Sequence, residues 1–152
     1  MFDLQELEAI KRLKYKYFRC MDTKRWAELA ECFTEDATCA YDGGKYAYEG
    51  RDKIMEFLEG AMGRPSMITQ HQVHHPEIEF TGDGAATGIW YLEDRVIDTE
   101  HDFVLQGAGF YRDEYVKREE GWRIRATGYE RTFEEVGQRS AVPFKLTRSM
   151  FG

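Results

Sequence analysis

The dominant spacing of apolar residues changes close to Pro65, and that change limits the possible folds more than any other feature. Before it, apolar residues recur every three or four positions, as they do on one face of an α-helix. After it come long runs rich in β-branched and aromatic residues, separated by short turn-forming segments. Helices gathered first and long strands afterwards predict an α+β fold with an antiparallel sheet, not alternating strand–helix units.

Three helices and one hairpin are predicted before the change. The apolar spacing places helices at residues 3–21 and 51–62, with a shorter one around Trp26 and Leu29. Residues 37–48, which two adjacent glycines divide, predict a short hairpin between the second and third helices. The basic side chains that alternate with the apolar positions of the first helix are expected to be solvated: Lys11, Arg12, Lys14 and Lys16.

Four long strands are predicted after the change, at residues 68–80, 85–97, 103–117 and 122–133. No composition shift marks an internal linker, so residues 1–136 are predicted to form one domain. Residues 137–152 are apolar but have no regular spacing. This tail is expected to be a lid, a subunit-contact arm or a disordered segment.

The charge of the chain excludes several classes of partner. Its 28 acidic and 21 basic residues give a net charge of −7, so neither nucleic acid nor an anionic membrane is expected to bind. No segment approaches the roughly 18 apolar residues of a membrane-spanning helix, and the first residues do not resemble a signal sequence. Cys20, Cys32 and Cys39 lack metal-ligand spacing and predict buried thiols. A reducing, cytoplasmic location is therefore expected.

The aromatic content favours a fold with a hollow. Aromatic residues make up 14% of the chain, and they must either pack a core or line a cavity. A bent sheet folded over helices leaves a hollow that suits a small apolar molecule. The other face of the sheet is expected to require a second subunit, in a homodimer or homotrimer, because it also carries apolar side chains. The candidates for that face are Trp90, Leu92, Phe110 and Tyr115.

Three stretches of the chain resemble proteins of the SnoaL-like, nuclear-transport-factor-2-like superfamily. They are YKYFRCMDTKRWAELAECFTEDATCAYDGGKYAYEGRDKIMEFL, QHQVHHPEIEFTGDGAATGIWYLED and GWRIRATGYERTF. The resemblance covers residues 5–135 and implies a cone-shaped α+β barrel of the cystatin-like type, with three helices on a strongly curved antiparallel sheet. The chain is similar to the branch that holds scytalone dehydratase, hexachlorocyclohexane dehydrochlorinase and bile-acid 7α-dehydratase.

These enzymes use an Asp–His pair, and the resemblance assigns that pair to Asp22 and His71. Asp22 ends the first helix in CMDTKRW, and His71 lies on the strand after the third helix in TQHQVHHPEIEF. The resemblance implies that His71 is the general base and that Asp22 fixes its tautomer. Tyr17 and Tyr41 resemble tyrosines that line the dehydratase pockets, and Arg131 resembles a pocket arginine. The family resemblance implies neither a cofactor nor a metal ion.

Physical chemistry agrees with this assignment. Histidine has an unperturbed pKa of about 6.5, which suits proton abstraction at neutral pH, and an apolar pocket excludes water from the reaction. The expected activity is that of a cofactor-independent lyase, similar to a dehydratase or dehydrohalogenase, or of an isomerase. Its expected substrate is a small, apolar, cyclic molecule in a closed pocket. The alternatives are a non-catalytic binding domain and a structural subunit like the β subunit of ring-hydroxylating dioxygenases.

The histidine assignment has competitors in the same strand. His74 or His75 can take the place of His71 in the pocket, because Pro76 can reset the alternation of side chains. A metal site is a weaker interpretation, since adjacent histidines on a strand point to opposite faces. Such a site would use His71, His74, His75 and His101.

The remaining candidates also have simpler interpretations. Asp22 at a helix junction is typical of an N-cap, and the tyrosines are typical of a core. An ion pair with Glu130 or Glu134 would explain Arg131 equally well. The chain also departs from scytalone dehydratase, because Met21 replaces a tyrosine and residues 92–97 lack a second pocket histidine. Scytalone itself is therefore not the expected substrate.

Overall fold

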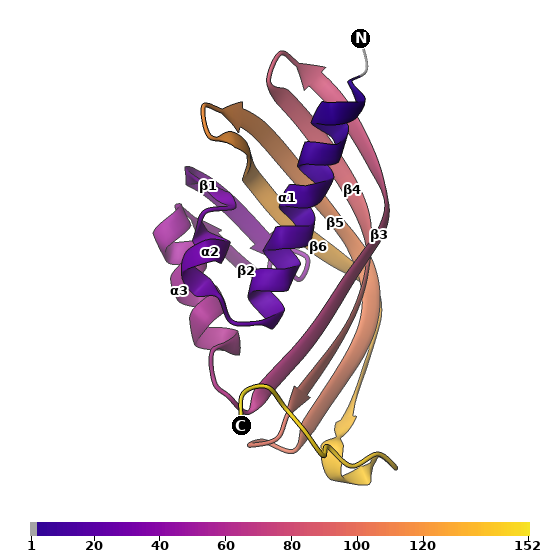
Figure 1. The fold of residues 1–152 in the computed structure, drawn as a ribbon. Helices are drawn as coiled ribbons and strands as arrows, with labels where there is room; N and C mark the ends of the chain where they lie inside the picture. The colour runs from indigo at the N-terminus through magenta and orange to yellow at the C-terminus, as the bar shows by residue number, and fades with distance from the viewer. Residues whose placement is uncertain (1–2) are drawn as a thin grey trace.

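The computed structural model of the chain describes residues 3–152 and has three helices packed on one side of a long sheet (Figure 1). This confirms the predicted α+β class. None of the helices within the described residues is long and apolar enough to cross a membrane. The elements in chain order are α1 (Leu4–Asp22), α2 (Trp26–Ala30), β1 (Phe33–Tyr41), β2 (Tyr46–Glu49), α3 (Arg51–Met62), β3 (Met67–Gly82), β4 (Ala85–Asp98), β5 (Phe103–Arg118), β6 (Gly121–Gln138) and the 3₁₀ turn η1 (Arg139–Ala141).

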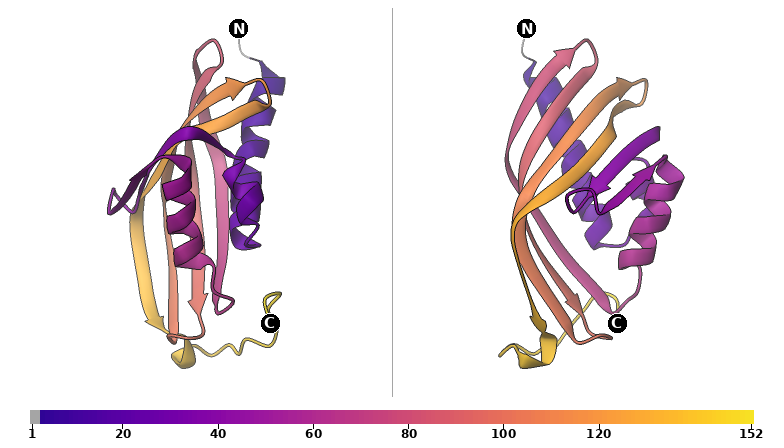
Figure 2. Two further views of the ribbon diagram at one scale, coloured as in Figure 1. Left: turned by 90° about the vertical axis from the view of Figure 1, so that its left-hand side faces the viewer. Right: turned by 180° about the vertical axis from the view of Figure 1, so that it is seen from behind.

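Six strands form one sheet in the order β2-β1-β6-β5-β4-β3. Neighbouring strands are antiparallel except β1 and β6, which run parallel. The sheet is therefore mixed, and it is strongly curved without closing into a barrel (Figure 2). Only antiparallel neighbours were expected, because the turns that can be recognised in a sequence are hairpin turns, and these join antiparallel strands. β1 and β6 lie far apart in the chain, so no turn fixes their relative direction.

The helices cover the concave face of the sheet and leave its convex face bare (Figures 1 and 2). Three of the residues expected on the outer face lie in the core beneath the helices instead, since Trp90, Leu92 and Tyr115 are at most 1% exposed. Phe110, the fourth, lines a hollow on the convex face together with Arg112. An oligomer stays a prediction. The large apolar side chains that the convex face presents to solvent are Tyr91 and Phe133.

The cysteines are buried, as predicted. Cys20, Cys32 and Cys39 are all free thiols with at most 4% of their surface exposed. Desolvation by burial raises the pKa of Cys32 to about 12, so this thiol stays protonated at neutral pH.

The core contains a buried lysine, and the expectation that Lys14 would be solvated is wrong. Its side chain is 0% exposed, and its Nζ lies 2.8 Å from Oδ2 of Asp113 and 3.9 Å from the ring centre of Tyr111. Asp113 also accepts hydrogen bonds of 2.6 Å from the hydroxyls of Tyr115 and Thr127. Burial lowers the pKa of Lys14. The residue is inside because α1 packs on the inner face of the sheet, where Asp113 supplies a counter-charge.

Polar contacts join the loops at the end of the sheet where β6 finishes. Arg64 binds Oδ2 of Asp98 at 2.9 Å and Oε2 of Glu100 at 2.6 Å. Lys24 donates a hydrogen bond of 2.6 Å to the carbonyl of Met67. The turn after α1, the loop before β3 and the loop after β4 are thereby held together.

Asp98 should make the stability of this end depend on pH. The hydrogen bond from Arg64 lowers the pKa of Asp98 below its ordinary value. A carboxyl whose pKa is lower in the folded state contributes stability above its unfolded pKa of about 3.9, and that contribution is lost as the pH falls through the folded value. We expect Asp98→Asn to be less stable than the natural chain at pH 7, with the difference shrinking below about pH 4. Urea unfolding at both pH values measures this, and a constant difference would contradict it.

The C-terminal tail runs along the same end of the sheet. β6 continues to Gln138, five residues beyond the predicted strand, because it keeps pairing with β5. From there the chain passes beneath the sheet towards the loop between α3 and β3 (Figures 1 and 2). It is tied at one end by Ser140, which binds the carboxylate of Asp102, and at the other by Phe151, whose ring lies 4.6 Å from Nζ of Lys24.

Candidate active site

Asp22 lies at the C-terminal end of α1, beside β3 at the edge of the sheet. An aspartate there faces the negative end of the helix dipole, so it needs other partners. It has three: the hydroxyl of Thr69 and Nδ1 of His71 donate to Oδ1 at 2.8 and 2.6 Å, and the backbone N–H of His71 donates to Oδ2 at 2.8 Å. The N-cap interpretation is wrong, because Arg25 occupies the N-cap position of α2.

His71 is held in one orientation by these contacts. Because a carboxylate only accepts hydrogen bonds, the hydrogen of the neutral ring lies on Nδ1 and the lone pair on Nε2. One face of the ring stacks on Phe18 at a centre-to-centre distance of 5.2 Å. The side chain is 9% exposed, and within residues 3–152 Nε2 has no hydrogen-bond partner. Nε2 is therefore the atom that is available to take a proton.

The other histidines do not join His71. His74 lies on the convex face and approaches Glu93 at 3.4 Å, and His75 has a positive φ of 28° at the irregularity before Glu77. His101 binds Asp98 in the loop after β4. The rings of His74 and His75 lie 6.3 Å apart, centre to centre, and neither they nor His101 contact His71. Among the described residues no group of three or more His, Cys, Asp or Glu side chains is arranged to hold a metal ion.

Tyr17 and Tyr41 come together in the interior. Their hydroxyl oxygens are 2.6 Å apart, and neither side chain is more than 3% exposed. Desolvation by burial raises the pKa of both phenols, so both stay protonated at neutral pH. Phe18 connects this pair to the histidine, because its ring contacts Tyr17 edge-on and stacks on His71.

Arg131 reaches across β5 to a residue that the sequence reasoning did not single out, Asp94. Two parallel hydrogen bonds of 2.8 Å join the guanidinium to the two carboxylate oxygens of Asp94. Nε of Arg131 lies 3.1 Å from Glu134, one of the two ion-pair partners considered above. Gly107 leaves room for the crossing, since a Cβ there would lie 2.8 Å from Nη1 of Arg131.

Asp94 belongs to the same site as the histidine. It lies directly opposite His71 in the β3–β4 register, and opposite residues in an antiparallel pair have their side chains on the same face. Asp94 stands in the acidic stretch EDRVIDTEHD, residues 93–102, which is typical of a solvated strand end and loop, yet its side chain is only 4% exposed. The signal that was missed is its alternation with Leu92, which is buried on the inner face.

Apolar side chains lie next to Asp22 and His71 on the inner face of the sheet. The register aligns Thr69, Val96, Leu105 and Val136 across the four long strands, one row beyond His71. Val136 is 62% exposed, because the strands extend past the helices at this end (Figure 1). An apolar surface beside His71 is thus left open to a ligand.

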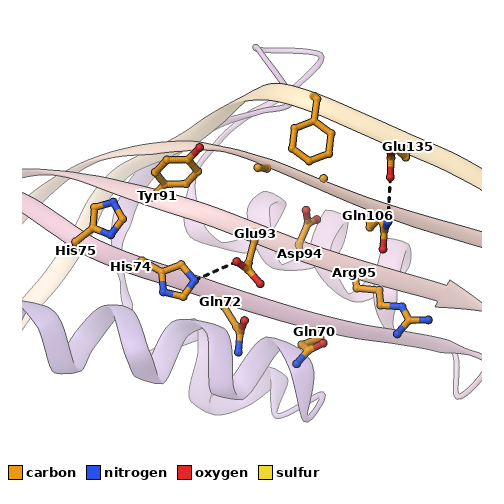
Figure 3. A pocket seen from close by; sticks show the side chains of 13 residues that line it. Gln70, Gln72, His74, His75, Tyr91, Glu93, Asp94, Arg95, Gln106 and Glu135 are labelled. Atoms are coloured by element: carbon orange, nitrogen blue, oxygen red, sulfur yellow. Dashed lines mark hydrogen bonds and ion pairs between the residues drawn. The ribbon is translucent and has the colours of Figure 1, made fainter.

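Five hollows among the described residues lie away from His71. One of about 670 Å³ opens on the convex face, where the side chains of Gln70, Gln72, Tyr91 and Arg95 surround it (Figure 3). The others range from about 280 to 880 Å³. None of these five is lined by Asp22 or His71, so the closed pocket expected around them is not among them.

Comparison with known proteins agrees with this architecture. Residues 3–127 match the SnoaL-like domain. The chain belongs to the SnoaL-like family. An uncharacterised Mycobacterium tuberculosis protein is 28% identical to this family member over 125 residues, which cover 80% of this chain and 82% of that protein.

Solved structures of similar fold include two with named reactions. A Novosphingobium aromaticivorans protein, provisionally described as a scytalone dehydratase, superposes with a TM-score of 0.80 and 26% identity over 87% of each chain. A hexachlorocyclohexane dehydrochlorinase of Novosphingobium barchaimii has a TM-score of 0.80 and 18% identity, and covers 94% of this chain and 96% of its own. These likenesses support the nuclear-transport-factor-2-like branch that the sequence indicates.

Proposed function

We propose that this SnoaL-like protein is a lyase or isomerase in which His71 removes a proton from carbon. The observation that carries the proposal is the 2.6 Å hydrogen bond between Asp22 and Nδ1 of His71. It leaves a basic Nε2 with a fixed direction, and the carboxylate stabilises the imidazolium that forms when Nε2 takes a proton. Positioned general-base catalysis of this kind contributes about 10²–10⁴-fold to a rate.

The proposed reaction needs no group beyond these side chains. Nε2 takes a proton from a carbon next to an electron-withdrawing group, and the electron pair of the broken C–H bond moves into the substrate. It forms a double bond as a leaving group departs, or it becomes an enolate whose oxygen needs stabilisation. Tyr17 and Tyr41 are the proposed donors to that oxygen, because the raised pKa values of both hydroxyls keep them protonated.

The relatives support this choice of reaction class. Dehydration and dehydrochlorination, the reactions named for the two similar structures, both remove a proton from carbon and expel a leaving group. We propose a small, apolar, cyclic substrate, because the row of Val96, Leu105 and Val136 offers an apolar surface beside His71.

The test is proton exchange on a neutral carbon acid. In D₂O the protein should accelerate exchange of the α-hydrogens of 2-tetralone, followed by proton NMR, because abstraction is the step shared by every reaction in this class. Chloride release from hexachlorocyclohexane tests whether elimination follows. The proposal would be contradicted if the protein exchanged the hydrogens no faster than buffer does, both for 2-tetralone and for smaller cyclic ketones.

A second candidate function is binding without chemistry. It is favoured by the absence of Asp22 and His71 from the linings of the five hollows within the described residues. A pure binder would hold 2-naphthol, a neutral bicyclic probe, yet leave the exchange rate of 2-tetralone unchanged. Isothermal titration of the probe beside the exchange measurement separates the two functions.

The tail is proposed to cover the bound ligand. Phe144 and Met150 are 70% and 73% exposed, which is unusual for apolar side chains this large, and they lie between the two points where the tail is tied.

We expect a chain ending at Ala141 to bind 2-naphthol about tenfold more weakly, since it loses apolar contact worth about 1.4 kcal/mol. The variant Phe144→Ser/Met150→Ser is the full-length control and should reproduce most of the loss. An unchanged Kd with a smaller assembly by light scattering would assign the tail to a subunit contact instead.

A further inference from the structure

The charges around His71 are mostly negative. Asp22, Asp94 and Glu134 contribute three carboxylates on this side of the sheet, and Arg131 contributes one guanidinium. Lys24, two residues after Asp22, donates hydrogen bonds to the carbonyl oxygens of Met62 and Met67. A ligand at Nε2 of His71 therefore meets more negative than positive charge.

The guanidinium of Arg131 is already occupied. Both of its terminal nitrogens donate to Asp94 in a bidentate pair, the geometry in which arginine binds carboxylates most strongly. Its Nε faces Glu134 at 3.1 Å, and its Cζ lies 5.3 Å from the ring centre of Tyr129. The hydrogen bonds that Arg131 donates to Asp94 raise the pKa of Arg131 further, so the guanidinium stays charged. The end of the guanidinium that could bind a ligand carboxylate in a bidentate pair is therefore filled by Asp94, and the Nε of Arg131 is buried.

The ion pair between Asp94 and Arg131 is protected by burial. The side chain of Asp94 is only 4% exposed and that of Arg131 11%, so water does little to weaken the pair. Separating the two would leave each charge buried without a partner, which is strongly unfavourable. Gly107 provides the space through which the arginine reaches Asp94.

We propose that Asp94 is a specificity-determining residue, which occupies Arg131 and thereby makes the site accept uncharged ligands and reject carboxylates. The substrate class that follows is a neutral compound with an oxygen acceptor, such as a cyclic ketone, rather than an organic acid. The inference rests on the proposed function only in taking the surface beside His71 as the ligand site, and it does not require that His71 act as a base.

The test compares two probes that share one ring system. At pH 7, 2-naphthol is neutral and 2-naphthoate carries a full negative charge. The natural chain should bind 2-naphthol at least tenfold more tightly by isothermal titration, and binding should shift the imidazole NMR signals of His71. Asp94→Asn removes the carboxylate that neutralises the guanidinium, so the ratio of the affinity for 2-naphthoate to that for 2-naphthol should rise about tenfold.

Two further variants make the result specific. Glu93→Gln removes the same charge from the neighbouring residue, whose side chain lies on the convex face and is 62% exposed, and it should leave the ratio of the two affinities unchanged. The double variant Asp94→Asn/Arg131→Gln should not show the increased affinity for 2-naphthoate. It also has no unpaired buried charge, so it serves as a control if the single variant Asp94→Asn folds poorly.

Several outcomes would overturn the inference. Equal or tighter binding of 2-naphthoate by the natural chain is one, and an unchanged ratio in folded Asp94→Asn is another. Binding of neither probe also refutes it, because the surface would not be a ligand site. A switched ratio without exchange of 2-tetralone would support the role of Asp94 while refuting the proposed catalysis, so the two failures are distinguishable.

Discussion

Replacing His71 with asparagine is expected to slow proton exchange on 2-tetralone by about 10²–10⁴-fold, the usual contribution of a positioned general base. The asparagine amide can still donate to Asp22, which keeps the buried carboxylate satisfied, but it has no basic nitrogen in place of Nε2. The melting temperature should therefore change little. Exchange rates by NMR and thermal unfolding by circular dichroism measure the two effects on the same samples.

His74→Asn is the matched control for this experiment. It makes the same replacement three residues along β3, on the convex face, where the imidazole only approaches Glu93. Its exchange rate should equal that of the natural chain. If His71→Asn kept full activity and lost several degrees of melting temperature, His71 would be a packing residue and the proposed mechanism would be wrong.

The largest effect on stability is expected from Lys14→Met. Methionine fills a similar volume, but it leaves the carboxylate of Asp113 in the core with only the hydroxyls of Tyr115 and Thr127. Removing one partner of a buried ion pair costs about 3–5 kcal/mol, which is a large share of the stability of a small domain. Urea unfolding followed by tryptophan fluorescence measures this loss.

A double variant separates the charge from the packing. In Lys14→Met/Asp113→Asn no unpaired charge remains, so most of the lost free energy of unfolding should return. Lys11→Met, on the partly exposed face of the same helix, should change stability by no more than about 0.5 kcal/mol. A loss for Lys14→Met no larger than for Lys11→Met would show that the buried pair contributes nothing to stability.

Local patterns of the sequence predicted most of the fold. The apolar spacing located α1, α3 and the four long strands to within a few residues, with β6 the main exception. Long-range pairing was not predictable in the same way. The parallel contact of β1 with β6 involves strands with no common turn, and a sequence contains no local signal for it.

The candidate site was predicted in part, for a similar reason. Asp22 and His71 stand at positions that the family resemblance marks, and the structure brings them within hydrogen-bond distance. The pair of Asp94 and Arg131 depends on the register of three strands and on the missing side chain at Gly107. Lys14 was misjudged because a lysine is almost never fully buried unless it is paired, and the paired residue is 99 positions away.

The parallel pairing of β1 with β6 also determines when this protein can finish folding. Residues such as Thr38 and Ala126, which face each other in the sheet, lie 88 positions apart in the 152-residue chain. Contacts this distant in sequence form slowly, because the intervening loop must be closed first. During synthesis the early hairpin therefore emerges from the ribosome with an open strand edge and stays exposed to aggregation until the last strand has been made.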